Sequence, residues 1–217
     1  EISVETADGP KTVQADRIIL ATGSETASIP AFPIDRKLIV TSDEALSWQT
    51  LPVSLLIVGG GVIGCEFAML FAAFGVKVTI VEAMPSLLAL ASVDSAIIKR
   101  LDALMKKGGV DARVNSRLKE ISANPTSDGV IAAFEDGATL QAEKALICIG
   151  RRPATSGLGF EEAGIALAAK GAVPVNEKMQ TNIPHIYAIG DMTGQWQLAH
   201  VASRQGIIAA ENAAGHN

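Results

Sequence analysis

The chain has 217 residues, of which 48% are hydrophobic and 19% are charged, and its formal net charge is −5. This length and apolar content predict one large or two small folded cores and exclude a disordered chain. The negative charge, without a local basic patch, argues against a nucleic-acid partner.

The N-terminal residues predict the edge of one domain followed by a linker. Residues 2–6 alternate in polarity as a strand does, residues 8–10 predict a turn, and residues 13–20 form a second strand. Residues 31–52 are richer in proline and polar groups and are expected to be a linker, within which residues 41–44 offer an N-cap to a short helix that runs through Trp48. No basic segment leads into an apolar core near the start, so no secretory signal is expected.

The pattern then changes to buried strands that alternate with helices. Residues 55–58, 65–74 and 76–81 predict strand, helix and strand, with glycines between the first two. A second helix is expected over residues 95–107, because Gly108 follows its last turn as a C-cap does.

Further strands are expected after this second helix. Three of them are predicted to form a meander, at residues 111–114, 119–122 and 130–134. Residues 145–149 predict a buried strand, and a polar, loop-rich stretch separates it from another strand at residues 186–189. A helix over residues 199–214 is expected to end at Gly215.

One apolar stretch raises the question of a membrane. Residues 55–76 are long enough to span a bilayer, with Glu66 as their only charge. The glycines at 59–61 and 64 would weaken a spanning helix, and a strand, a turn and a buried helix account for the same residues. No membrane partner is therefore expected.

The two cysteines, Cys65 and Cys148, lie far apart in apolar runs. Their spacing fits neither a disulfide framework nor a metal site. The start of a helix could lower the pKa of Cys65, but no second cysteine follows four or five positions away. Both are expected to be buried core thiols in a reducing, cytoplasmic setting.

A glycine-rich turn separates the first buried strand from its helix. It fits the pattern GxGxxG with Gly59, Gly60, Gly61, Val62, Ile63 and Gly64. The first of these glycines permits the tight turn, the third lets the backbone approach a pyrophosphate, and the last lets the helix pack closely on the sheet. The helix N-terminus would then offer N–H groups to the phosphates. A structural turn without a ligand is the alternative interpretation.

Two carboxylates accompany this turn. Glu82 ends the next strand, where it can accept hydrogen bonds from both hydroxyls of an adenosine ribose and would repel a 2′-phosphate. Residues 83–86 contain no arginine, so the pattern predicts a Rossmann unit for NAD rather than NADP. Glu66 either complements the helix dipole or is a partly buried acid that needs a partner, and the sequence leaves both open.

Five motifs occur in a characteristic order, at residues 21–24, 59–66, 149–153, 187–191 and 198–200. In this order the whole chain resembles the flavin-dependent pyridine nucleotide-disulfide oxidoreductases, and among them most the dihydrolipoyl dehydrogenases. The resemblance implies an α/β fold, with a Rossmann-like NAD-binding domain and a three-stranded β-meander over residues 53–150. Parts of a split FAD-binding domain would flank it at residues 1–30 and 151–217.

The resemblance also implies two sets of cofactor-binding residues. The FAD would be bound by Thr22, Gly23, Ser24, Asp191, Gln197, Leu198, Ala199 and His200. The NAD would be bound by the glycine turn together with Cys65, Glu66, Glu82, Leu118 and Gly150, and Leu118 is assigned to a loop. Because the segment around His200 works through its backbone in this family, no residue is assigned as catalytic and none as a metal ligand.

The implied parent enzyme oxidises dihydrolipoamide and reduces NAD through a redox disulfide and FAD. It would be a homodimer serving 2-oxo acid dehydrogenase or glycine cleavage complexes. The family's redox cysteines would precede Glu1 and its His-Pro base would follow Asn217, so this chain is expected to be inactive alone and not to retain FAD. The alternatives are another FAD-dependent oxidoreductase, such as a transhydrogenase or mercuric reductase, and a stand-alone NAD-binding or redox-sensing module.

Overall fold

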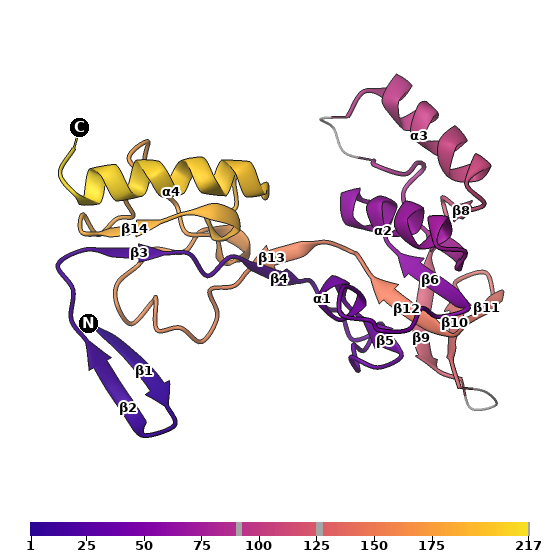
Figure 1. Cartoon of the computed structure of the whole chain (residues 1–217), viewed down its shortest axis with the longest axis horizontal. Coiled ribbons are helices and arrows are strands. Elements are labelled where there is room, and N and C mark those ends of the chain that lie inside the picture. The colour runs from indigo at the N-terminus through magenta and orange to yellow at the C-terminus, as the bar shows by residue number, and fades with distance from the viewer. Residues whose placement is uncertain (90–92, 125–127, 217) are drawn as a thin grey trace. The chain divides into compact units, whose positions relative to one another are not determined.

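The computed structural model describes residues 1–89, 93–124 and 128–216. They divide into two compact units (Figure 1). Unit 1 comprises Glu1–Glu25 and Arg151–Asn217, and unit 2 comprises Thr26–Gly150.

Unit 2 is built on a five-stranded sheet in which all neighbouring strands are parallel. In spatial order its strands are β5 (Ile39–Val40), β12 (Lys144–Ile147), β6 (Ser54–Val58), β7 (Lys77–Val81) and β8 (Asp111–Arg113). The helices of this unit are α1 (Ser42–Ala45), α2 (Val62–Ala73) and α3 (Ser95–Lys107). The predicted strand, helix and strand are therefore β6, α2 and β7, and α3 spans the residues predicted for it.

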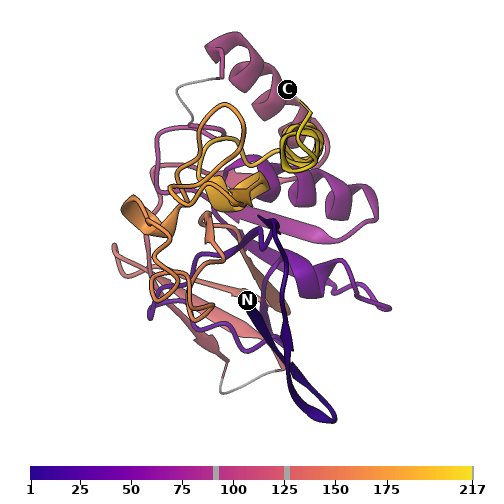
Figure 2. The same ribbon diagram turned by 90° about the vertical axis from the view of Figure 1, so that its left-hand side faces the viewer.

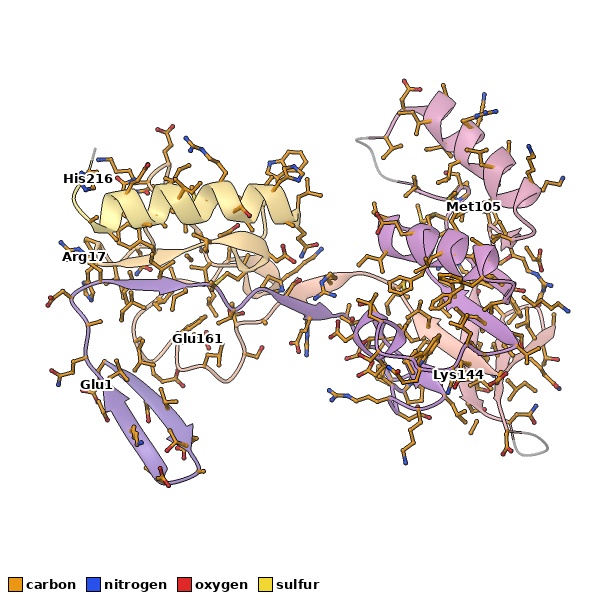
Figure 3. All side chains as sticks on the ribbon, in the orientation of Figure 1. Glu1, Arg17, Met105, Lys144, Glu161 and His216 are labelled. Atoms are coloured by element: carbon orange, nitrogen blue, oxygen red, sulfur yellow. The ribbon has the colours of Figure 1, made fainter. Side chains whose placement is uncertain are left out.

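Both faces of this sheet are buried, which explains the continuous apolar runs of its strands. Along β6, Leu55 and Ile57 pack with α2 and α3, including Met105, which is labelled in Figure 3. Leu56 and Val58 face the opposite way and pack against a second, antiparallel sheet. Side chains alternate across a strand, so one strand contributes to two cores.

The antiparallel sheet is a three-stranded meander, but its strands differ from those predicted. It consists of β9 (Leu118–Ala123), β10 (Val130–Phe134) and β11 (Thr139–Ala142). Residues 111–114 were expected in this meander, whereas Asp111–Arg113 extends the parallel sheet as β8. A strand of three residues carries too little periodicity to indicate which sheet it joins.

The interpretation of residues 31–52 as a linker is wrong. Val40 is fully buried in β5, and the Trp48 ring packs on the Phe71 ring with centroids 5.3 Å apart. Lys144, labelled in Figure 3, lies with its Nζ 5.8 Å from the Trp48 ring centre. Within the predicted capping stretch of residues 41–44, Thr41 caps α1 in a capping box with Glu44, but the helix ends at Ala45 and does not reach Trp48. Elements of two and four residues are too short to show a period in the sequence.

Unit 1 contains a parallel pair of strands, β3 (Ile18–Leu20) and β14 (Ile186–Ala188), with α4 (Ala199–Ala213) packed beside it. Figure 2 shows α4 nearly end-on. The remaining elements of the unit are β1 (Ile2–Thr6), β2 (Gly9–Val13), β13 (Arg151–Pro153), η1 (Ala169–Gly171), η2 (Gly190–Thr193) and β4 (Ser24–Thr26), of which the last residue is counted with unit 2. Residues 13–20 are not one strand, because Val13 ends β2 and pairs with Ile2 in a hairpin. Pro10 is tolerated within β2, since this two-stranded ribbon has only edge strands.

Within residues 1–89, 93–124 and 128–216, no helix is both long and apolar enough to cross a membrane. The apolar stretch over residues 55–76 divides into β6, the glycine turn and α2.

Candidate functional site

A cavity of about 520 Å³ lies at the carboxyl edge of the parallel sheet in unit 2. Val58 and Val81, the last residues of β6 and β7, form part of its wall. The other lining residues are Ile29, Phe32, Gly59, Gly61, Glu82, Ala83, Met84, Ala89, Arg117, Leu118, Glu135, Cys148, Ile149 and Gly150. Ligands of open α/β sheets bind at this edge, where the loops after the strands converge.

The cavity brings together part of the predicted NAD set. Its wall includes Gly59, Gly61, Glu82, Leu118 and Gly150. The structure does not place the rest of that set in the wall, namely Gly60, Val62, Ile63, Gly64, Cys65 and Glu66. The prediction that Leu118 lies in a loop is wrong, because it is the first residue of β9.

The glycine turn is packed so tightly that two of its positions cannot carry a side chain. Gly59 has φ +106°, and a Cβ built on it would overlap the carbonyl oxygen of Cys148. A Cβ on Gly64 would overlap the carbonyl oxygen of Gly59. The first glycine thus allows the turn, and the last lets α2 lie directly against it.

Gly61 differs from these two glycines, because a Cβ built on it would meet no atom within 4 Å. Its backbone is extended, with φ −72° and ψ −171°, and it is the N-cap of α2. No side chain caps this helix end. The first N–H groups of α2 therefore remain open beside the cavity, as an anion site at a helix N-terminus requires.

Glu82 is held in place by backbone donors from both sides. The N–H of Gly60 donates to its Oε2 at 2.6 Å, and the N–H of Met84 donates to its Oε1 at 2.7 Å. Each carboxylate oxygen accepts more than one hydrogen bond, so both can still receive a hydroxyl of a bound ribose. The carboxylate is thus fixed beside the glycine turn and faces the cavity.

Glu66 is exposed on α2, so the interpretation as a partly buried acid is wrong for this chain. It also lies beyond the first turn of α2, which contains no acidic residue, and the helix dipole acts mainly within that turn, so the dipole interpretation is weak as well. Cys65 is buried next to it, and its thiol donates to the carbonyl of Gly60 at 3.3 Å.

Both cysteine thiols are free and disfavour ionisation. Burial raises the pKa of Cys65 to about 11, with further contributions from the charges of Glu82 and Glu66. Burial also raises the pKa of Cys148 to about 12. Such thiols stay protonated at neutral pH and are poor nucleophiles. The described residues contain no group of three or more His, Cys, Asp and Glu side chains that could hold a metal ion.

Part of the predicted flavin-side set meets in unit 1, where Ser24 contacts Asp191 and Thr22 contacts the neighbouring Met192. The hydroxyl of Ser24 donates to Asp191 Oδ2 at 2.5 Å, and Arg151 Nε donates to the same hydroxyl oxygen at 2.6 Å. The Thr22 hydroxyl lies 3.5 Å from the sulfur of Met192. This network orients the Asp191 carboxylate, which can accept hydroxyl donors from a polyol such as the ribityl chain of FAD.

A buried glutamine supports the turn that carries Asp191. Gln205 of α4 is 6% exposed, and its Oε1 accepts the N–H of Gly190 at 2.7 Å. Gly190 has φ +72°, a conformation that glycine adopts without strain. Gln205 therefore ties the start of η2 to the helix beside it.

The segment that begins α4 is exposed. Gln197, Leu198, Ala199 and His200 all have exposed side chains, and no side chain caps the helix. The backbone donors of its first turn are therefore open. This arrangement agrees with a role through backbone groups and gives the His200 imidazole no buried surroundings.

Sequence reasoning missed Arg117, Glu135 and Phe32 in the cavity wall and Gln205 in unit 1. No local motif surrounds these residues, because long-range packing brings them to their sites. Two features of the sequence could have indicated them. Arg117 directly precedes Leu118, which was assigned to the NAD site, and Gln205 is a polar residue within an apolar helix.

A family model described as pyridine nucleotide-disulphide oxidoreductase matches residues 2–206. A dihydrolipoyl dehydrogenase of Bacillus subtilis (strain 168) is 43% identical over 221 residues, which cover 100% of this chain and 46% of that protein. One from Mycobacterium leprae (strain TN) is 40% identical and covers 99% of this chain and 46% of its own length. The chain spans about half the length of the curated relatives it matches.

Two solved structures are similar over nearly the whole chain. LpdA from Mycobacterium tuberculosis has a TM-score of 0.89 and 33% identity, covering 99% of this chain and 46% of its own. The HOCl-induced flavoprotein disulfide reductase RclA from Escherichia coli has a TM-score of 0.87 and 32% identity, covering 100% of this chain and 48% of its own.

Proposed function

Because this chain belongs to the pyridine nucleotide-disulphide oxidoreductase family, we propose that unit 2 is the NAD(H)-binding part of an FAD-dependent dihydrolipoyl dehydrogenase. The family binds FAD and NAD(P). The observation that carries the choice of NAD is Glu82, whose carboxylate is fixed at the carboxyl edge of the sheet beside the glycine turn.

The physical support for NAD comes from charge and hydrogen bonding. The open N–H groups at the start of α2 suit the pyrophosphate, and the open space at Gly61 lets it approach the backbone. The Glu82 carboxylate can accept both hydroxyls of the adenosine ribose, and a 2′-phosphate in their place would meet a like charge.

The flavin would be held on the unit 1 side. Asp191, oriented by Ser24 and Arg151, has the acceptor chemistry that the ribityl hydroxyls need. When bound, FAD supplies the two-electron relay between a dithiol and a nicotinamide. In the proposed whole reaction, dihydrolipoamide loses two electrons and two protons to form its disulfide, NAD⁺ takes a hydride, and one proton is released.

The redox chemistry on sulfur is proposed for cysteines other than those of this chain. Cys65 and Cys148 are both free, and burial keeps them protonated near neutral pH. Thiol–disulfide exchange requires a thiolate, so neither fits the attacking role. We also propose that the whole enzyme is a homodimer and that it serves 2-oxo acid dehydrogenase or glycine cleavage complexes.

A second candidate is a disulfide reductase similar to RclA, which the structural similarity of 0.87 in TM-score favours. The two candidates differ in the thiol substrate and share the nucleotide site. Turnover of dihydrolipoamide by the whole protein that carries these residues separates them.

The proposed nucleotide site is tested by titrating the chain with NADH and NADPH and following the binding heat. We expect NADH to bind better, and Glu82→Ala to lose about 1.5–3 kcal/mol of charge-assisted hydrogen bonding, or roughly ten- to a hundred-fold in NADH affinity. NADPH binding should fall much less, because the loss of the hydrogen bonds to Gly60 and Met84 is offset by removal of the charge that repels the 2′-phosphate. Glu120→Ala, which removes an exposed carboxylate of β9, is the matched control. Equal losses for both nucleotides would contradict the assignment of Glu82.

A further inference from the structure

Arg117 is held next to Glu82 by the backbone of a turn that no sequence motif marks. After β8, the N–H of Asn115 donates to the carbonyl of Met84 at 2.9 Å, and the N–H of Ser116 donates to the carbonyl of Glu82 at 2.9 Å. Asn115 has φ +50°, a left-handed conformation that asparagine tolerates. The loops after β7 and β8 are therefore joined through the backbone of Glu82 and Met84.

The backbone of Arg117 is also fixed from its other side. Its carbonyl accepts the N–H of Glu135 at 3.0 Å, which ties it to the residue after β10. Arg117 thus has hydrogen-bonded neighbours before and after it in the chain. The direction in which its side chain leaves the backbone is set by the fold and not by the side chain's own contacts.

The guanidinium of Arg117 is available for a ligand. The residue is exposed and forms part of the cavity wall. In the part of the chain that the structure describes, its side chain takes part in no hydrogen bond or ion pair. The other charged groups of this wall are the carboxylates of Glu82 and Glu135. One cation and two anions therefore face the same space.

We propose that Arg117 is a second specificity-determining residue, a phosphate-binding cation whose preference for NADPH is overridden by Glu82. This inference rests on the proposed nucleotide site in unit 2. A 2′-phosphate carries two negative charges near neutral pH, so Glu82 repels it while Arg117 attracts it. Arginine suits this role because its planar fork can bind two phosphate oxygens at once. Neutralising Glu82 leaves Arg117 as the cation of this wall, with Glu135 as its remaining carboxylate.

The test is a comparison of NADPH and NADH binding to the native chain and its variants by titration calorimetry. Glu82→Gln keeps one carbonyl oxygen for the backbone donors and removes the charge. We expect it to bind NADPH about tenfold more tightly than the native chain does, and Glu82→Gln with Arg117→Ala to lose that gain. Glu82→Gln with Arg117→Lys should retain part of it. Glu82→Gln with Lys119→Ala is the matched control, because Lys119 is exposed on β9 but outside the cavity wall.

The outcomes separate this inference from the proposed function. Failure of the native chain to bind NADH would overturn the nucleotide site and the inference together. Normal NADH binding, with the same NADPH affinity for Glu82→Gln in the presence and absence of Arg117, would overturn only the inference. The Arg117-dependent gain should also weaken steeply with added salt, because it is a charge interaction at an exposed site. Circular dichroism of each variant shows that the fold is retained.

Discussion

The contrast between Gly61 and Gly64 gives a sharp test of how the turn works, because the same substitution should affect different properties at the two positions. In Gly64→Ala the added Cβ would lie 3.1 Å from the carbonyl carbon of Gly59 and would overlap its oxygen. Gly59 is itself fixed, since its N–H donates to the carbonyl of Val81 at 2.9 Å. The clash is with backbone, so no side-chain rotation can relieve it.

Two opposing free-energy contributions determine whether Gly64→Ala stabilises or destabilises unit 2. Alanine in place of glycine in a helix gains up to about 1 kcal/mol in propensity. Overpacking of a rigid site costs about 1–3 kcal/mol, and relieving this overlap requires a shift of α2 on the order of 1 Å. We therefore expect a net loss of about 1–2 kcal/mol in the free energy of unfolding of unit 2.

The same change at Gly61 should leave folding intact. Its backbone angles are allowed for alanine, and the new methyl would meet no protein atom within 4 Å. The free energy of unfolding should change by less than about 0.5 kcal/mol. NADH affinity should nevertheless fall at least about tenfold, because the methyl occupies the space through which the pyrophosphate approaches the backbone.

Urea unfolding can be followed by the fluorescence of Trp48, which packs on Phe71 in the core of unit 2. A Trp196→Phe background removes the other tryptophan, which belongs to unit 1. NADH binding is measured on the same samples by calorimetry. Native stability in Gly64→Ala would refute the packing argument. Native NADH affinity in Gly61→Ala would show that the nucleotide does not approach this backbone.

Two further predictions concern the thiols and the support of Asp191. Because burial raises the pKa of Cys65 to about 11 and of Cys148 to about 12, both should resist alkylation at pH 8 in the folded chain. The contribution of these buried thiols to the free energy of unfolding should be complete below pH 9, where the thiols of the unfolded chain are also protonated. It should be lost as the pH rises through 9 to 12. A Cys65→Ala, Cys148→Ala variant whose free energy of unfolding falls equally over this pH range would contradict this. Gln205→Leu leaves the Gly190 N–H without its acceptor and should cost unit 1 about 1–3 kcal/mol, whereas Gln205→Glu keeps the acceptor. Hydrogen exchange at Gly190 measures this effect, and equal protection in the native and Gln205→Leu chains would refute it.

The features that the sequence predicted well are those fixed by neighbours in the chain. One strand, the turn after it and the next strand fix the relative positions of Gly59, Gly64 and Glu82. Their spacing in the sequence is therefore enough to predict their arrangement. An N-cap was predicted within residues 41–44 for the same reason, since the capping box of Thr41 and Glu44 lies within four consecutive residues. In each case the interacting groups belong to one supersecondary unit.

The features that the sequence did not predict depend on contacts between distant segments. Arg117 reaches the cavity because Ser116 and Glu135 bind backbone groups of other loops, and no pattern around residue 117 records that arrangement. The burial of Val40 depends on β12, which follows it by about a hundred residues. The assignment of Asp111–Arg113 to the parallel sheet likewise depends on its pairing with β7. Pairings between strands that lie far apart in the sequence cannot be predicted from local patterns and become visible only in the tertiary structure.

The position of Glu82 limits how its substitutions can be interpreted. Its Oε2 accepts the N–H of Gly60, so this one side chain connects the ribose end of the cavity with the glycine turn that serves the phosphates. Removing the carboxylate by Glu82→Ala therefore takes away a ribose acceptor and also a brace of the turn. The affinity lost by the alanine variant is an upper bound on the hydrogen bonding to the ribose. Glu82→Gln loses the charge but keeps an acceptor for one of the backbone donors. The difference in nucleotide affinity between Glu82→Ala and Glu82→Gln therefore separates the support of the turn from the direct interaction with the nucleotide.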